Sequence, residues 1–290
     1  MKNLTLALGA LLVSITTSVV SAAPSTPWTY GQDNAGPQHW GKLDPKYGIC
    51  GTGKMQSPID IAVGAPHVNV QAEGFSTLKY KPLYNVLCGY DGHGVKCEWP
   101  NTTTDNKNKT IKNENSLVIQ GKTYTLSQFH FHTPSEHRID GHFADGELHL
   151  VHQAADLKLA VVGLLLEVEI KNNPFFDWIV KLDKEVDQVT KGHGFLVKDK
   201  VTGAPIAGKE QVKYKVDKVD FTGLLMDTSN FTPRWEYEGS LTTPPCDENV
   251  AWNMVKQHVG LGLEQFDALV DLEAFNSRFI QDRPNKPKRK

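Results

Sequence analysis

The stretch "KTYTLSQFHFHTPSEH", Lys122 to His137, alternates polar and apolar side chains in its first part. Such alternation is typical of a β-strand with one buried face. On a strand, the two phenylalanines of the stretch point to one face, and His130 and His132 share the other. Two imidazoles spaced in this way can reach one metal ion. The stretch therefore predicts a strand with an aromatic face and a metal-binding face.

A second segment, "GELHLVH" from Gly146 to His152, repeats this arrangement. On a strand, Glu147, His149 and Val151 share one face, whereas the two leucines point to the other. If this strand lies beside the first, His149 completes a set of three imidazoles. Three neutral imidazoles suit zinc and leave a further position open for water, which is typical of catalytic zinc sites.

Each of these strands also offers a partner for its histidine. A histidine that binds a metal usually donates its second N–H to a carboxylate, an amide or a carbonyl. Gln128 precedes His130 by two residues, and Glu147 precedes His149 by two, so each partner lies on the metal-binding face. Packing is the alternative for a lone His-x-His strand, but the third histidine with its carboxylate favours the metal.

Other segments predict one mainly β (α+β) domain with helices packed around a large sheet. "LAVVGLLLEVEI", residues 159–170, is apolar over a strand-like length. A helix is expected after Asn173 and Pro174, because apolar residues follow at intervals of three and four. A second helix is expected over Leu263–Phe275. The chain has no polar linker that would divide it.

The N-terminus predicts an exported protein. Lys2 precedes the apolar run "LTLALGALLVSITTSVV", which ends in the small residues "SAA". This pattern predicts a signal peptide over residues 1–22, with residues 23–290 as the mature domain; a membrane anchor is the alternative. We therefore expect a periplasmic or secreted protein. The 31 Lys and Arg nearly balance the 33 Asp and Glu, which argues against nucleic acid or a membrane as partner.

The chain has four cysteines, Cys50, Cys88, Cys97 and Cys246. An even number in an exported chain predicts disulfides, and three pairings are possible. A bridge between Cys88 and Cys97 is natural because they are close in sequence, and Cys50 with Cys246 would then close most of the domain. A cysteine zinc site is the alternative, but the chain has no C-x-x-C pair.

Two segments are expected to lie on the surface. Residues 100–116, "PNTTTDNKNKTIKNENS", are polar and rich in Asn and Lys, which predicts an exposed loop inserted between strands. Residues 285–290 form a basic C-terminal tail.

Long motifs of this chain resemble those of the α-class carbonic anhydrases, especially the exported bacterial ones. The motifs are "QFHFHTPSEH", "ELHLVH", "WTYG" at Trp28, "HWGKL" at His39, "QSPIDI" at Gln56 and "GSLTTPPC" at Gly239. The resemblance covers residues 28–284. It implies a single domain with a large twisted, mostly antiparallel central sheet and short peripheral helices.

The resemblance also implies an active site. It identifies His130, His132 and His149 as ligands of a zinc cofactor. Thr242 resembles the threonine that hydrogen-bonds zinc-bound hydroxide, and Glu136 resembles the glutamate that accepts the threonine's proton. Thr243 resembles the residue near bound bicarbonate. The resemblance also implies an apolar wall that binds the substrate together with Thr242 and Thr243. The wall residues are Val151, Val161, Leu241 and Trp252.

His93 resembles the histidine that carries protons to solvent. In this chain Tyr90 and Asp91 replace the two asparagines that precede it in the family, and a plain surface histidine is the alternative. Cys50 and Cys246 match the disulfide common in exported members of the family.

The implied function is the reversible hydration of carbon dioxide to bicarbonate and a proton, by attack of zinc-bound hydroxide, with a histidine proton shuttle. The substrate is a small molecule. Two alternatives are a non-catalytic binding module on the same fold and a zinc-dependent esterase. The sequence leaves monomer and homodimer equally open.

Overall fold

We describe the protein from a computed structural model. The described residues are 27–62, 64, 68–90, 93–100, 102–104, 109–112, 115–190 and 213–282. The expected signal peptide, residues 1–22, and the basic tail, residues 285–290, lie outside them.

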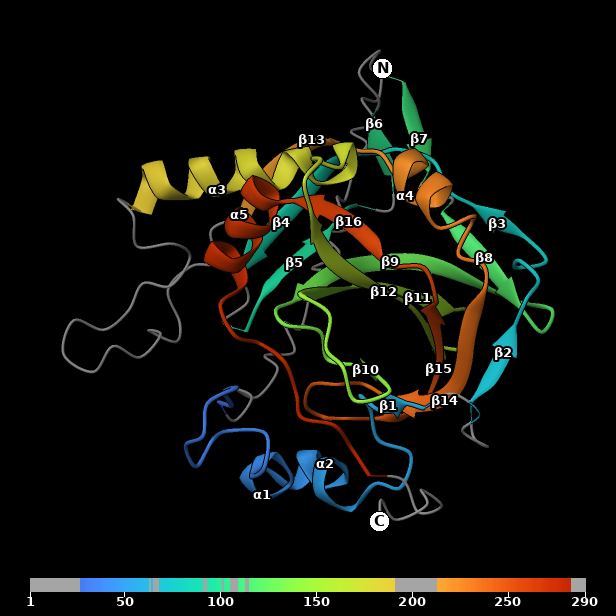
Figure 1. Ribbon diagram of the computed structural model, residues 1–290, viewed down its shortest axis with the longest axis vertical. Helices are drawn as coiled ribbons and strands as arrows, with labels where there is room; N and C mark the ends of the chain where they lie inside the picture. Colours follow the sequence, from blue (N-terminus) through green and yellow to red (C-terminus); the bar gives the residue numbers. More distant parts are fainter. Residues whose placement is uncertain are drawn as a thin grey trace, which may run out of the picture.

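A twelve-stranded sheet forms the centre of the molecule (Figure 1). Its main path runs β13–β4–β5–β9–β11–β12–β15–β14–β2, with β16 beside β12 and with β8 between β3 and β9. The strands are β2 (Asn69–Gln71), β3 (Leu78–Lys79), β4 (Leu83–Tyr90), β5 (Val95–Glu98), β8 (Ser116–Ile119), β9 (Lys122–His132), β11 (Gly146–Ala154), β12 (Leu159–Glu169), β13 (Lys213–Val219), β14 (Arg234–Ser240), β15 (Glu248–Val255) and β16 (Val259–Gly262). Among the described strands of this sheet, the only parallel pairs are β12 with β15 and β12 with β16. The predicted mainly β fold with a mostly antiparallel sheet is confirmed.

Two small sheets lie apart from the central one. β1 (Asp60–Ile61) pairs in parallel with β10 (Arg138–Ile139), and β6 (Thr102–Thr104) pairs with β7 (Thr110–Lys112). The second pair falls within the polar segment 100–116. Sequence reasoning treated that segment as a loop, but its β-branched Thr and Ile residues pair as a short hairpin.

The helices lie outside the central sheet (Figure 1). They are α1 (Trp40–Leu43), α2 (Ile49–Thr52), α3 (Asp177–Thr190), α4 (Thr222–Asp227) and α5 (Leu263–Glu273), with 3-10 turns at Pro45–Tyr47 and Pro174–Phe176. Figure 1 shows α3 and α5 side by side, far from α1 and α2. The predicted start after Asn173 is confirmed, because its side chain accepts from the Phe175 N–H at 3.0 Å.

One β-bulge changes the faces of β9. In its pairing with β11, Val151 is opposite Gln128 and His152 is opposite Leu126, so Ser127 is an extra residue. Strict alternation would place Leu126 on the histidine face. The bulge instead turns it to the opposite face, where it joins the same buried cluster as Phe129. The polar face of β9 is thereby restricted to the strand's last residues.

Apolar clusters pack on both faces of the sheet around β11. The larger cluster contains Phe129, Leu148 and Leu150, all buried. The smaller one contains Val151 and Val161, next to the histidine face. Burial of each such side chain contributes about 1.5–3 kcal/mol, so strands β9 and β11 form a rigid support for polar groups placed on them.

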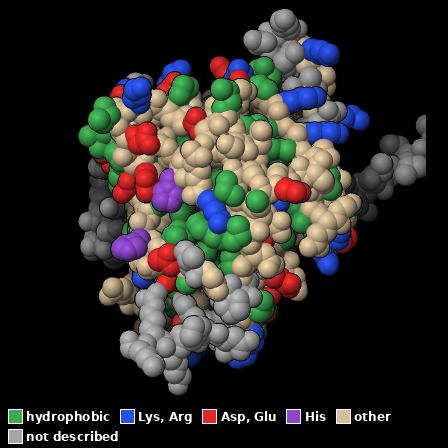
Figure 2. Space-filling model, turned by 45° about the vertical axis from the view of Figure 1, so that its right-hand side comes forward, with side chains coloured by type: hydrophobic (Ala, Val, Ile, Leu, Met, Phe, Trp, Pro, Cys, Tyr) green, Lys and Arg blue, Asp and Glu red, His purple; other side chains and the backbone are tan. Residues whose placement is uncertain are grey.

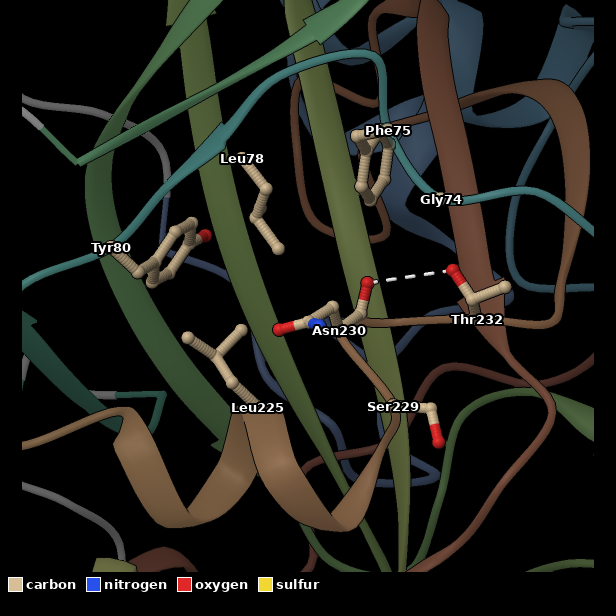
Figure 3. A pocket seen from close by; sticks show the side chains of 8 residues that line it. All are labelled: Gly74, Phe75, Leu78, Tyr80, Leu225, Ser229, Asn230 and Thr232. Carbon is tan, nitrogen blue, oxygen red and sulfur yellow. Dashed lines mark hydrogen bonds between the residues drawn. The ribbon is translucent and has the colours of Figure 1, made fainter.

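A surface cavity of about 490 Å³ has none of the three clustered histidines in its lining (Figure 3). Its lining residues are Gly74, Phe75, Leu78, Tyr80, Leu225, Ser229, Asn230 and Thr232. At this side of β11, the Tyr80 hydroxyl and His152 Nε2 share a hydrogen bond of 2.5 Å. Burial lowers the pKa of His152 to about 3, so this imidazole is neutral. His152 therefore belongs to the larger core and not to the histidine face.

Candidate metal centre

The register of β9 and β11 brings the three predicted histidines together. His149 lies directly opposite His130, and Glu147 lies opposite His132. Residues opposite each other in an antiparallel pair project to the same face. One nitrogen from each of the three imidazoles lies within 4.8 Å of the others, and His130 Nε2 is 3.1 Å from His149 Nδ1. The cluster is nearly closed to solvent, because His132 and His149 are buried.

The outer nitrogen of each ring is held by an acceptor. His130 Nδ1 donates to Gln128 Oε1 at 2.8 Å, and His149 Nε2 donates to Glu147 Oε1 at 2.6 Å. His132 Nδ1 donates to the backbone carbonyl of Asn276 at 2.8 Å. Because these protons are on the outer nitrogens, a neutral ring presents a lone pair on the inner one. The three lone pairs converge on one point.

The surroundings keep the imidazoles neutral. Burial, followed by the neighbouring His149 and His132, holds the pKa of His130 well below its usual value. Burial also lowers the pKa of His132, although Glu136 opposes that shift. Neutral rings are the form that binds a metal.

The donor set fits a zinc ion. Two facing lone pairs, on His130 Nε2 and His149 Nδ1, repel each other unless a cation lies between them. His132 Nε2 is buried and has no hydrogen-bond partner among the described residues. A buried nitrogen without a partner is costly. A cation bound to all three nitrogens would remove both penalties, and three imidazoles suit zinc.

Glu147 is the anchor of this arrangement. Its Oε2 accepts from the backbone N–H groups of Glu136 and His137, at 2.9 and 2.8 Å. Its Oε1 accepts from His137 Nδ1 at 2.7 Å and from His149. Burial alone raises the pKa of Glu147, but His137 and His149 outweigh it and bring this pKa well below the usual range. The ionised carboxylate thus fixes the orientation of the His149 ring.

A second group of possible ligands, His137, Glu147 and His149, shares this carboxylate. Its atoms already hydrogen-bond one another, and His137 Nε2 accepts from the Tyr237 hydroxyl at 2.5 Å. No lone pair of His137 remains directed at a metal. This group orients the histidine cluster and is not a separate metal site.

Glu136 lies beside the cluster with one oxygen unsatisfied. Its side chain is fully buried, and Oε1 accepts from the backbone N–H of Arg278 at 3.0 Å. Oε2 lies 3.5 Å from His132 Nε2 and has no hydrogen-bond partner within the described part of the chain. Thr242 is buried in the loop after β14, but within the described chain no hydrogen bond joins it to Glu136. Glu136 Oε2 is therefore a buried acceptor without a donor among the described residues.

The four predicted wall residues gather beside His149. Val151 on β11 pairs with Val161 on β12, which pairs with Trp252 on β15. Leu241 packs against this cluster, and the Trp252 and His149 rings lie 4.9 Å apart. Thr242 follows Leu241 directly, so the threonine loop borders the apolar wall.

Both predicted disulfides are present. Cys50 is bonded to Cys246, and Cys88 is bonded to Cys97. The Cys246 N–H donates to the Thr243 carbonyl at 2.8 Å, so the first bridge connects the threonine loop to α2. The second bridge joins opposed residues of β4 and β5.

His93 lies two residues before β5, beside the segment that precedes α1. Its imidazole stacks on the Trp28 indole with ring centroids 3.4 Å apart, and its Nε2 donates to the Trp28 carbonyl at 2.9 Å. The side chain is half-buried. The ring is thus held between the protein and solvent.

Sequence reasoning missed the contribution of the C-terminal segment. Beyond holding His132 through its carbonyl, Asn276 accepts from the Thr133 N–H at 2.8 Å through Oδ1. Arg278 donates to the carbonyls of Ser57 and Cys50 at 2.7 and 3.1 Å. In Figure 1 this segment runs from α5 past β10 toward α1 and α2. A backbone carbonyl is present at every residue, so no residue type in the sequence signals this contact.

The family of the chain follows from comparison with known proteins. A family model described as eukaryotic-type carbonic anhydrase matches residues 35–283. The chain belongs to the α-carbonic anhydrase family. This result confirms the resemblance seen in the sequence, and the chain is accordingly an enzyme of the carbonic anhydrase type.

Individual relatives agree with the family model. The chain is 31% identical to alpha carbonic anhydrase 4 of Arabidopsis thaliana, covering 89% of this chain and 83% of the relative. It is also 31% identical to the carbonic anhydrase of Pectobacterium carotovorum, covering 94% and 93%. Among solved structures, the fungal α-carbonic anhydrase of Aspergillus oryzae superposes with a TM-score of 0.70 at 28% identity, covering 89% and 94%.

Within the described chain, no helix has the length and apolar character needed to cross a membrane. The two disulfides and the bacterial relative are consistent with an exported carbonic anhydrase.

Proposed function

We propose that this carbonic anhydrase hydrates carbon dioxide reversibly to bicarbonate and a proton, with a zinc ion held by His130, His132 and His149. The observation that supports the metal most strongly is the set of three inward lone pairs whose outer N–H groups are already engaged. Zinc in such a site lowers the pKa of a coordinated water to about 7 and so supplies a nucleophile at neutral pH; carbonic anhydrase is itself the known case for this value.

Thr242 and Glu136 orient the reacting water in this proposal. In the working enzyme the Thr242 hydroxyl would donate to Oε2 of Glu136, which has no other hydrogen-bond partner among the described residues. Since its proton is then committed, the hydroxyl can only accept a hydrogen bond from the reacting water. That bond turns a lone pair of the water oxygen toward the wall beside His149.

In this proposal the apolar wall binds carbon dioxide and Thr243 binds bicarbonate. Carbon dioxide is small and has no net dipole, so the apolar side chains of Val151, Val161, Leu241 and Trp252 suit it. Thr243, which is half-buried and follows Thr242 directly, is proposed to hydrogen-bond bicarbonate.

His93 is proposed to carry the released proton to solvent, because imidazole titrates near neutral pH and this ring lies at the protein surface. His93→Ala is expected to lower turnover roughly 10²-fold in weak buffer. Added imidazole should restore much of the rate. His142→Ala, which removes an exposed histidine, is the matched control. Unchanged turnover of His93→Ala in weak buffer would mean that protons leave by another route.

The Cys50–Cys246 bridge is proposed to hold the threonine loop in place. Replacing both cysteines with serine should lower activity severalfold at temperatures where the protein is still folded. The bridge spans 196 residues, so its loss should also cost about 5 kcal/mol of stability. The control is the double serine variant of Cys88 and Cys97, which span 9 residues. Activity and melting temperature are measured together, and a strictly parallel fall in both would contradict a local role.

Export is proposed from the N-terminal segment and the disulfides. Oxidised cysteines persist in the periplasm and outside the cell, which fits cleavage of residues 1–22 before the enzyme folds. The face in Figure 2 carries both acidic and basic side chains, with several basic ones at its upper right.

A further inference from the structure

Lys96 projects to the same face of the sheet as the histidine cluster. Strand β5 pairs with β9 in antiparallel fashion, and Lys96 lies directly opposite His130. The next residue, Cys97, lies opposite Phe129 and is buried in the larger core. Because side chains alternate along a strand, Lys96 points away from that core. Directly opposed Cβ atoms lie about 5 Å apart, so the lysine stem starts beside the His130 ring.

An acidic partner holds the lysine at the rim of the site. Lys96 Nζ lies 2.9 Å from Glu98 Oε1. Glu98 is two residues along β5 and therefore shares the face of Lys96. The two side chains are 37% and 43% exposed, so the pair lies between the buried histidines and solvent.

Among the described residues, the interior of the site offers no comparable positive side chain for an anion. The carboxylates nearest the histidines, Glu136 and Glu147, repel anions. Arg278, although nearby, is buried, and its guanidinium binds Gln56 and backbone carbonyls. An anion that approaches the cluster from solvent past β5 therefore meets the Lys96–Glu98 pair.

We propose that Lys96 is a specificity-determining residue for the charged reactant: its ammonium strengthens the binding of bicarbonate and other small monovalent anions, and Glu98 limits this effect. The proposal rests on the function proposed above. Carbon dioxide carries no charge, so its use is not expected to depend on this pair. The proposal makes Lys96 a determinant of how tightly the enzyme retains its anionic product.

The two charge-neutralising variants are expected to act in opposite directions. Lys96→Gln removes the attraction and should weaken anion binding about threefold, a modest value because the pair is partly exposed and screened by salt. Glu98→Gln leaves the ammonium uncompensated and should strengthen binding by a similar factor. Lys96→Arg keeps the charge and should resemble the wild-type enzyme. A general structural disturbance would not weaken anion binding in Lys96→Gln and strengthen it in Glu98→Gln.

The test uses thiocyanate as the anion at constant ionic strength. Its inhibition constant is measured against carbon dioxide hydration, and its dissociation constant is measured by the visible spectrum of the cobalt(II)-substituted protein. Bicarbonate is then tested as an inhibitor in the same way. Lys122→Gln is the matched control, because Lys122 is also 37% exposed and ion-paired, with Asp156, but lies at the far end of β9.

Opposite shifts for Lys96→Gln and Glu98→Gln, with kcat/KM for carbon dioxide changed less than about twofold, would support the proposal. The proposal for Lys96 would be overturned if the thiocyanate constants were equal in all variants, or if they shifted in the same direction in Lys96→Gln and Glu98→Gln. Either result would leave the proposed function intact. A wild-type protein that takes up neither cobalt nor zinc, or that does not hydrate carbon dioxide, would instead refute the proposed function.

Discussion

Replacing His132 with alanine is expected to leave the protein almost free of zinc and to reduce carbon dioxide hydration to background. The reason is geometric, because His132 supplies one of only three inward lone pairs and its Nε2 has no other partner among the described residues. Two remaining imidazoles hold zinc poorly. Zinc should fall from near one per chain to below about 0.1, and the rate should fall roughly 10³-fold or more.

The control for this variant is His142→Ala, which removes an exposed histidine outside the cluster. Zinc content is measured by elemental analysis after dialysis, and activity is measured on the same samples. The control should keep both. Full zinc and full activity in His132→Ala would contradict the proposed ligand set.

Replacing Thr242 with alanine is expected to have a different signature. The variant should keep its zinc, because the hydrogen bonds that hold the three imidazoles in the described part of the chain come from Gln128, Glu147 and the Asn276 carbonyl. Its rate should nevertheless fall about 10²-fold, the usual effect of removing one hydrogen-bonding group that acts in the transition state. The physical reason is that the reacting water loses the acceptor that orients it.

Two further variants separate orientation from general damage to the threonine loop. Thr242→Ser keeps the hydroxyl and should recover most of the activity. Glu136→Gln keeps the volume of the side chain but offers a weaker acceptor, so its rate should also fall with zinc retained. Loss of zinc from Thr242→Ala, or a normal rate in that variant, would contradict the role assigned to the hydroxyl.

Local patterns in the sequence predicted the two strands of the histidine cluster. The alternation of "GELHLVH" placed Glu147 and His149 on one face, and the structure shows this arrangement. The bulge at Ser127 was not predicted, because a bulge depends on the partner strand rather than on its own sequence. Without it, Leu126 would face the histidines.

Contacts between distant segments could not be predicted in the same way. Gln128 and Glu147 were found because each partner is two residues from its histidine. The Asn276 carbonyl lies 144 residues from His132, and a carbonyl leaves no mark on the sequence. The wall formed by Val161 and Trp252 depends on the parallel pairing of β12 and β15, so only the family resemblance indicated it.

The most direct test of the central proposal is stopped-flow carbon dioxide hydration on the mature protein, with zinc determined on the same sample. We expect about one zinc per chain from the single set of three imidazoles, fast turnover, loss of both with a chelator and recovery of both when zinc is returned. Bound zinc without turnover, or turnover that persists after the zinc has been removed, would contradict the proposal.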